Sequence, residues 1–208
     1  KIPVKKLIQT LKNIWSIDEL KNKIIITLAL ILVYRFGTHI VLPGLDPNRI
    51  EEAQQNPDPE GLLGLFDMFA GGAFSQASIL ALGIMPYISA SIFMQLMTIL
   101  LPQMQKIQKE GESGRKKINQ WTRYLTVIVT AFQASAYIGY LNSLGPQVFI
   151  PAYRDYFVFS TVVILTAGTL FVMWLGEKIQ DKGLGNGTSI IIMEVIIAIF
   201  PQSRIKEF

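Results

Sequence analysis

Cysteine is absent from this chain of 208 residues, and histidine occurs once, as His39. Without cysteine there is no disulfide framework and no thiolate metal site. A single histidine also excludes a metal centre built from several imidazoles. Charged residues make up only 16% of the sequence, against about a quarter in soluble globular domains. We therefore expect neither a disulfide-stapled secreted module nor a metalloprotein.

Catalytic signatures are equally scarce. The sequence has no Walker-type phosphate loop, no HExxH zinc motif and no GxSxG nucleophile elbow. The stretch from Gly183 to Gly187 begins like a dinucleotide-binding fingerprint, but no strand pattern precedes it and its third glycine comes too early. It is typical of a turn. The apolar runs contain Arg35 and Glu194 as their charged residues, too few for acid–base catalysis. The sequence predicts a protein that is not an enzyme, with no cofactor.

Long apolar runs are what the sequence does have, and most charged residues lie between them. The runs cover residues 24–42, 77–101, 124–141, 156–175 and 187–200, of which the last is short. A transmembrane helix needs about 20 mostly apolar residues, and backbone at that depth must satisfy its own hydrogen bonds, which forces a helix. A soluble body of this size cannot bury so many such runs. The sequence predicts an all-α, polytopic transmembrane helical bundle.

The first run has a basic approach, as a secretory signal peptide does. Because Arg35 interrupts it and no small-x-small cleavage site follows, we expect a retained span. Before this run, in residues 1–22, apolar residues recur with helical spacing and lysines lie on the other side. The pattern favours an amphipathic helix in the cytoplasmic interface, with a solvated lead-in as the alternative.

The basic residues divide the connecting segments into two kinds. Segments 1–23 and 102–123 hold six basic residues each and 176–186 holds two, whereas 43–76 and 142–155 hold one each. Because loops rich in lysine and arginine stay on the cytoplasmic side, we expect a multi-pass protein with a cytoplasmic N-terminus. The net charge of +4 then needs no nucleic acid as a partner.

The stretch 61–78 is apolar and aromatic but rich in glycine, and it carries Asp67. Glycine costs about 1 kcal/mol relative to alanine in a helix, and irregular backbone at membrane depth needs protein or a water-filled cavity around it. We expect a short re-entrant segment that folds back from the outer side and enters the second span at Gly71-Gly72. An ordinary hydrophobic loop is the alternative, which the pattern leaves open.

The second span contains Pro86, which removes an amide donor and is expected to bend the helix. Ile84 and Ile88 flank this proline on one helix face. Plain helix packing is the simpler explanation of that pair. Polar Ser91 and Gln95 follow, and such small and polar residues favour a closely packed bundle.

Five sets of short motifs follow one another along the chain: Tyr34-Arg35 with His39-Ile40 and Pro43-Gly44, Asp67 to Ala73, Ala81 to Ile92, Glu110 to Lys117, and Trp174 to Glu177 with Lys182 to Gly187. Collinear over about residues 15–192, they resemble the SecY family, which forms the centre of the bacterial protein-conducting channel. In the order given, they resemble the first helix and its exit, the plug, the second helix, the second cytoplasmic loop and the loop before helix five of that family.

Members of that family have ten transmembrane helices in two pseudo-symmetric halves, and this chain resembles the N-terminal half, helices one to five. The resemblance implies a mid-membrane constriction of aliphatic side chains, which dewets when empty. The matching positions are Ile84 and Ile88 in the second helix and Ile192 in the fifth, with Thr188 as a weaker candidate.

The resemblance also implies a plug on the outer side of the constriction, over about residues 62–74, with its glycines as hinges and Asp67 keeping one side hydrated. Its residues are Leu62, Leu65, Phe66, Asp67, Phe69, Gly71 and Gly72. Helices two and three would line half of a lateral gate that opens to lipid. The gate residues are Pro86, Ser91, Gln95 and Gln133.

The partners implied by the resemblance are SecE and SecG homologues in the membrane, the SecA ATPase and the ribosome on basic cytoplasmic loops, signal sequences, unfolded preproteins and membrane lipid. The location implied is the bacterial inner membrane. The partner-binding residues would be Lys106, Lys109, Arg115, Lys116, Lys117 and Lys182. A secondary transporter for a small solute is the alternative, since it shares broken helices, although isoleucine, proline and serine at mid-membrane favour a nonspecific pore.

Overall fold

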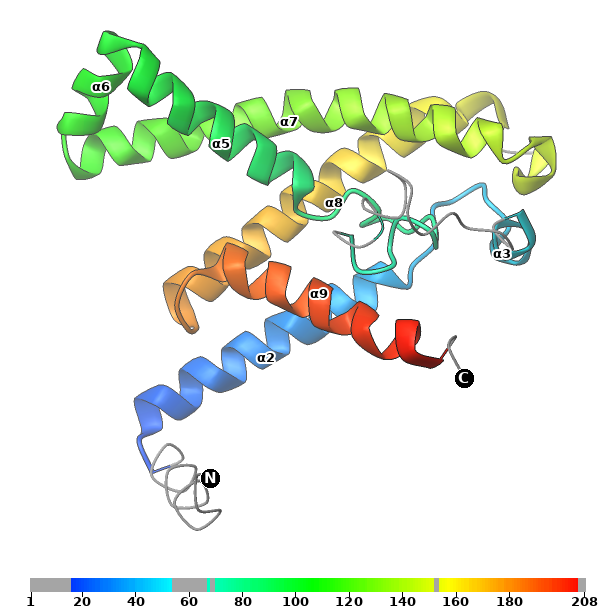
Figure 1. Ribbon diagram of the computed structural model, residues 1–208, viewed down its shortest axis with the longest axis horizontal. Helices are drawn as coiled ribbons and strands as arrows, with labels where there is room; N and C mark the ends of the chain where they lie inside the picture. The colour runs from blue at the N-terminus through cyan, green and yellow to red at the C-terminus, as the bar shows by residue number, and fades with distance from the viewer. Residues whose placement is uncertain (1–15, 54–66, 68–69, 152–153, 206–208) are drawn as a thin grey trace.

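The computed structural model describes residues 16–53, 67, 70–151 and 154–205. Within these residues the regular elements are helical, apart from two isolated β-bridges, so the all-α prediction is confirmed. The elements are α2 (Asp18–Thr38), α3 (Pro47–Ala53), α5 (Met85–Leu100), α6 (Pro102–Lys109), α7 (Glu112–Ser143), the 3-10 helix η1 (Pro146–Val148), α8 (Arg154–Lys182) and α9 (Gly187–Ile205) (Figure 1).

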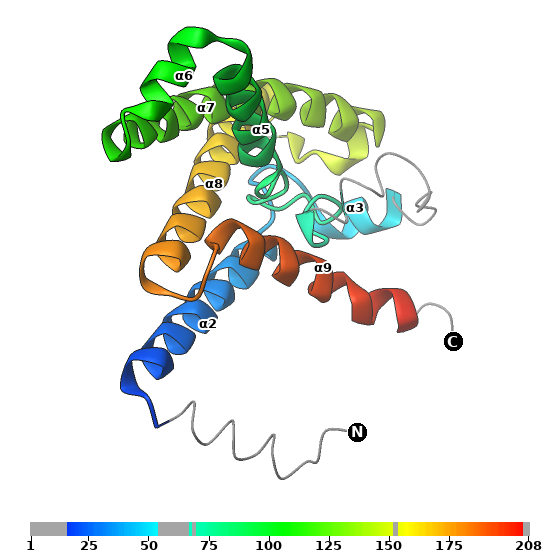
Figure 2. The ribbon, with the colours of Figure 1, turned by 60° about the vertical axis from the view of Figure 1, so that its left-hand side comes forward.

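Helix α8 lies at the centre of the bundle. It packs against α7, α9, α2 and α5, and α5 and α6 pack in turn against α7. Figures 1 and 2 show α5, α6 and α7 toward one end of α8, while α2 and α9 cross near its other end. Residues 70–84, which precede α5, contribute side chains to both of the apolar clusters described below.

Two described helices, α7 and α8, are each long and apolar enough to cross a membrane. Helices α5 and α6 would form a third span if the bent pair is taken together. The apolar part of α9, Gly187–Ala198, is shorter than a span. Helix α2 has 21 residues and reaches about 31 Å, but it carries charged residues near both ends. By length and composition, the described helices thus supply two spans, or three with the bent pair, and the span boundaries expected from the sequence stay predictions.

The helix ends differ most from prediction around the second apolar run. Residues 71–84 are mainly turns, and α5 begins only at Met85. Pro86 thus lies in the first turn of α5, where its missing amide interrupts no helical hydrogen bond. The bend predicted at Pro86 is wrong. The chain bends by 101° between α5 and α6, because Leu101, which precedes Pro102, has extended backbone.

Other helices extend beyond the apolar runs from which they were predicted. Helix α7 starts at Glu112 and α8 continues to Lys182, both well beyond the apolar runs that predicted them. Helix α2 starts at Asp18 and continues without a break into the first span. Most of the predicted amphipathic helix, residues 1–15, lies outside the described residues. The turn predicted from the glycines that follow Lys182 is present between α8 and α9.

A ridge of small residues on α7 explains its close packing. Thr122, Thr126, Thr130 and Ala134 are spaced four apart and are buried. Each threonine hydroxyl donates to the carbonyl four residues earlier, at 2.6–2.9 Å, so the buried oxygens are satisfied inside the helix. The flat ridge lets the neighbouring helices approach α7 closely.

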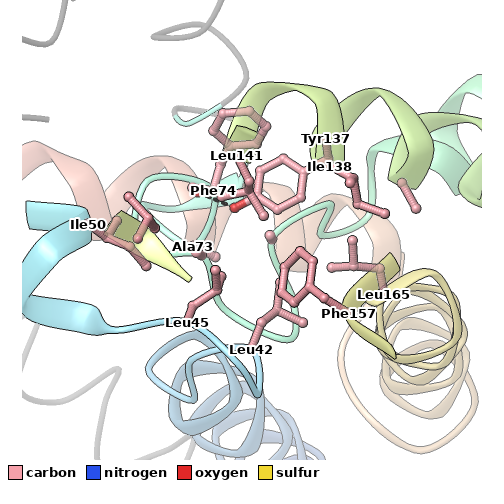
Figure 3. Close-up of a cluster of buried hydrophobic side chains, with 14 of the residues drawn as sticks. Leu42, Leu45, Ile50, Ala73, Phe74, Tyr137, Ile138, Leu141, Phe157 and Leu165 are labelled. Carbon is pink, nitrogen blue, oxygen red and sulfur yellow. Dashed lines mark hydrogen bonds between the residues drawn. The ribbon is translucent and has the colours of Figure 1, made fainter. Parts of the chain in front are cut away.

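Two apolar clusters hold the elements together. The first joins the chain after α2, residues 70–81, α7 and α8 (Figure 3). Its larger members include Leu42, Leu45, Ile50, Phe74, Tyr137, Ile138, Leu141, Phe157 and Leu165. The second, called the α2–α8–α9 cluster below, consists of Tyr34, Leu80, Ile84, Val172, Leu175, Ile179, Ile191 and Val195.

The non-helical chain before α5 is anchored by backbone pairing. The Leu42 amide donates to the Ala77 carbonyl and the Ile79 amide to the Ile40 carbonyl, each at 2.8 Å. The exit of α2 therefore pairs with the turns that lead into α5. This pairing satisfies backbone groups that a helix would otherwise satisfy internally.

Candidate functional site

The three isoleucines predicted for the constriction come together in space. Ile84 belongs to the α2–α8–α9 cluster, and Ile88 and Ile192 pack against it. Ile84, just before α5, is only 2% exposed, whereas Ile88 on α5 and Ile192 on α9 keep part of their surface. Ile84 therefore packs inside this chain. Thr188, the weaker candidate, forms a hydrogen bond with Tyr87.

Residues 70–76, called the 70–76 segment below, turn sharply beside this cluster. Gly71 and Gly72 have φ of 67° and 79°, a left-handed conformation that only glycine adopts readily. The Asp67 carboxylate accepts a hydrogen bond from the Ser75 amide at 2.8 Å, and the Asp67 carbonyl accepts one from the Gly72 amide at 3.1 Å. Asp67 therefore closes the turn and is only half-buried. The other predicted plug residues, Leu62, Leu65, Phe66 and Phe69, lie outside the described residues.

Arg35 connects this segment to α2. Its guanidinium Nη1 donates to the Gly71 carbonyl at 3.3 Å. The sequence left open whether Arg35 turns outward or pairs inside the bundle, and the structure shows an internal contact. No local pattern signalled it, because the two residues are 36 positions apart.

An apolar cavity of about 140 Å³ lies where the 70–76 segment meets α7. Phe74 and Tyr137 form its wall, with ring centroids 4.7 Å apart, and the Tyr137 hydroxyl donates to the Phe74 carbonyl at 2.7 Å (Figure 3). Gln133, one of the predicted gate residues, also lines this cavity, as does Tyr140. The two tyrosines were missed in the sequence, where they are simply part of an apolar run.

The other predicted gate residues lie apart from Gln133. Ser91 and Gln95 line a separate polar hollow of about 250 Å³ between α5, α6 and α7, together with Arg115. The Gln95 amide donates to the Ser91 hydroxyl at 3.4 Å. Pro86 is buried. The structure thus places Gln133 at one hollow and Ser91 and Gln95 at another, while Pro86 is buried and lines neither.

The basic residues predicted to face partners are exposed. Two of them form ion pairs, Lys116 with Glu112 and Lys117 with Glu110, each at 3.2 Å. The exposed residues are Lys106, Lys109, Arg115, Lys116, Lys117 and Lys182. They lie on α6, the start of α7 and the end of α8.

Comparison with known proteins identifies the family. The model of the SecY family matches residues 78–208, more than half of the chain. This chain belongs to the SecY family. The resemblance found in the motifs is thereby confirmed.

Relatives agree with this assignment. The protein translocase subunit SecY of Streptomyces scabiei is 46% identical over 199 residues, which cover 91% of this chain and 46% of that protein. The same-named protein of Pseudomonas aeruginosa is 47% identical over 195 residues, covering 93% and 43%. That of Buchnera aphidicola subsp. Schizaphis graminum is 43% identical over 202 residues, covering 96% and 46%. The chain spans about half the length of these curated relatives.

The SecY family and the apolar helices α7 and α8 together make this a membrane protein. The three relatives carry the name of a protein translocase subunit, and none is named as a solute transporter. The alternative of a secondary transporter for a small solute gains no support from them.

Proposed function

We propose that this chain forms one half of a protein-conducting channel, which passes unfolded secretory polypeptides across the membrane and releases membrane segments laterally into lipid. The observation that carries the proposal is the meeting of Ile88 and Ile192, from two helices, at one apolar cluster beside the 70–76 segment. The proposed activity is transport and involves no covalent step.

The constriction works by excluding hydration. Aliphatic side chains offer neither ions nor water a hydrogen-bonding partner, so a ring of them dewets at rest and yields around a passing chain without binding it. Ile88 and Ile192 keep the partial exposure that residues lining a pore need. Ile84 supports them from inside the bundle.

The proposed plug, over about residues 62–74, covers this ring from the outer side in the closed state. The left-handed glycines Gly71 and Gly72 allow the chain to reverse there, and the Asp67–Ser75 contact holds the turn. Helices α5 and α7 form half of the lateral gate, with Gln133 beside the apolar cavity and Ser91 and Gln95 at the polar hollow.

Partners supply the energy and complete the assembly. The exposed basic residues on α6, α7 and α8 suit the SecA ATPase and the ribosome on the cytoplasmic face, and homologues of SecE and SecG would lie beside the helices in the membrane. The charge distribution supports a bacterial inner-membrane protein with a cytoplasmic N-terminus.

The test uses the complete channel that contains this chain, reconstituted with its partner subunits in planar bilayers. Replacing Ile88 and Ile192 together by asparagine (Ile88→Asn, Ile192→Asn) should raise the resting ion conductance, because polar side chains wet the ring. Ile197→Asn is the matched control, since Ile197 lies on the same helix as Ile192 and is 58% exposed.

The expected result is a leak in the double variant and none in the control. An unchanged resting conductance in a double variant that assembles normally rejects the constriction. Preprotein import into vesicles by the unaltered channel tests the translocation function itself.

A further inference from the structure

Glu194 on α9 is a charged residue that the proposed function leaves unused. It lies in an apolar helix and is half-buried, and its Oε2 atom is buried with no hydrogen-bond partner among the described residues. A buried carboxylate oxygen without a donor is costly. Such an atom indicates either a missing partner or a second state in which a partner arrives.

Two donors lie within electrostatic range of Glu194 without bonding to it. The Arg35 guanidinium and the Tyr34 hydroxyl, neighbours in the last turns of α2, both interact electrostatically with its carboxylate. The Tyr34 side chain is only 1% exposed, and its hydroxyl has no hydrogen-bond partner in the described part of the chain. A buried donor and a buried acceptor are therefore both unsatisfied in the same region.

Arg35 is occupied elsewhere in this structure. It donates to the Gly71 carbonyl at 3.3 Å. Gly71 in turn lies against α9: a side chain at this position would contact Val195 at 3.5–3.7 Å. Val195 follows Glu194, and the Glu194 carboxylate is within electrostatic range of the Arg35 guanidinium, so this carboxylate is a second possible acceptor for Arg35.

The two acceptors differ in strength. A hydrogen bond from arginine to a carboxylate is about twice as strong as one to a neutral carbonyl and is shorter and often bidentate. The observed bond to Gly71 is long for a charged donor. In this structure, with the 70–76 segment beside α9, Arg35 is bonded to the weaker of the two acceptors.

We infer that Arg35 is a positioning residue that exchanges acceptors, holding the Gly71 carbonyl when the 70–76 segment is seated and the Glu194 carboxylate when that segment leaves. The Tyr34 hydroxyl adds a second hydrogen bond to Glu194 in the released state. Glu194 thereby stabilises the open channel and Arg35 the closed one. The inference rests on the proposed channel function.

The experiment measures the accessibility of the 70–76 segment in the complete channel, reconstituted with its partner subunits in vesicles. Because this chain contains no cysteine, Gln76→Cys introduces a single thiol into it, at a half-buried position. The remaining subunits are made free of accessible cysteine. The rate at which a membrane-impermeant maleimide modifies the introduced thiol is measured in two states. One is the resting channel, and the other is a channel that holds a preprotein whose own tightly folded carboxyl-terminal domain stops its passage.

Arg35→Gln should raise the resting rate about tenfold, because the seated segment loses a charged hydrogen bond. Glu194→Gln should leave the resting rate unchanged and reduce the ratio of engaged to resting rate about tenfold. Tyr34→Phe should change the ratio in the same direction, and Glu194→Asp should restore part of it. Glu19→Gln, which removes an exposed carboxylate from the first turn of α2, should change neither rate.

The different effects of the two variants on the resting rate separate an exchange of acceptors from a purely structural role. If Glu194→Gln raises the resting rate as Arg35→Gln does, the two residues only hold the helices together and the inference fails. An unchanged ratio in Glu194→Gln also overturns it. If the unaltered channel imports no preprotein, the proposed function fails instead, and the import assay on the unaltered channel distinguishes the two.

Discussion

The guanidinium of Arg123 on α7 donates hydrogen bonds to both carboxylate oxygens of Glu177 on α8, with Nη2 2.7 Å from each oxygen and Nε 3.0 Å from Oε1. The planar fork of arginine matches two oxygens in this way. Tyr87 of α5 interacts electrostatically with both charges and forms a hydrogen bond with Thr188 of α9. The ion pair thus joins α7 to α8, and Tyr87 links it to α5 and α9.

Arg123→Lys keeps the charge but loses the fork, and we expect it to lower the unfolding free energy of the complete channel by about 1 kcal/mol. The effect is limited because the side chains are 51% and 34% exposed. Thermal unfolding in detergent measures it. Lys116→Gln is the control, because it breaks an ion pair with Glu112 in which both side chains are far more exposed, 77% for Lys116 and 85% for Glu112. Equal losses in the two variants would argue against a special role for the Arg123 pair.

Tyr137→Phe removes the buried hydroxyl that donates a hydrogen bond to the Phe74 carbonyl. We expect a loss of about 1 kcal/mol in unfolding free energy, together with faster hydrogen exchange of the amides in residues 70–81. The control is Tyr156→Phe, since Tyr156 is 78% exposed on α8. Unchanged exchange rates in Tyr137→Phe would show that the hydroxyl does not hold this part of the chain.

Two glycines should respond to alanine with opposite signs. At Gly168 on α8 an added methyl group would clash with the Ile79 carbonyl, so Gly168→Ala should destabilise the channel. At Gly139 on α7 an added methyl group would meet no described residue within 4 Å beyond its own helix turn, so Gly139→Ala should stabilise the helix by up to about 1 kcal/mol. Thermal unfolding of both variants decides the point. A shift of the same sign in both would mean that the close approach at Gly168 is unimportant.

Ile84 and Ile88 should also differ when replaced singly by asparagine. Ile84 is 2% exposed in the α2–α8–α9 cluster, and an asparagine there buries an unsatisfied amide at a cost of about 3 kcal/mol. Ile84→Asn should therefore reduce the yield of assembled channel, whereas Ile88→Asn should assemble and leak ions. Quantifying assembled protein and resting conductance for both variants checks this, and the reverse assignment would show that Ile84 faces the pore.

The predicted and observed helices agree best for α7 and α8. Helices α7 and α8 were found because their runs carry no charge, but their ends were missed because polar residues such as Arg123 and Lys178 continue a helix without an apolar signal. Around Pro86 the local rule pointed the wrong way. Proline bends a helix only from an interior position, and the sequence does not say where in a helix it falls.

What the sequence determined by itself is the class of the protein: apolar runs too long for a soluble core, basic loops between them, and motifs of the SecY family. Only the tertiary structure decided which isoleucine is buried, that Gln133 and Gln95 lie at separate hollows, and that Arg35 contacts Gly71. The reason is physical. Apolarity and turn chemistry act over a few residues, whereas the partner of a long charged side chain depends on which distant segment the folded chain brings beside it.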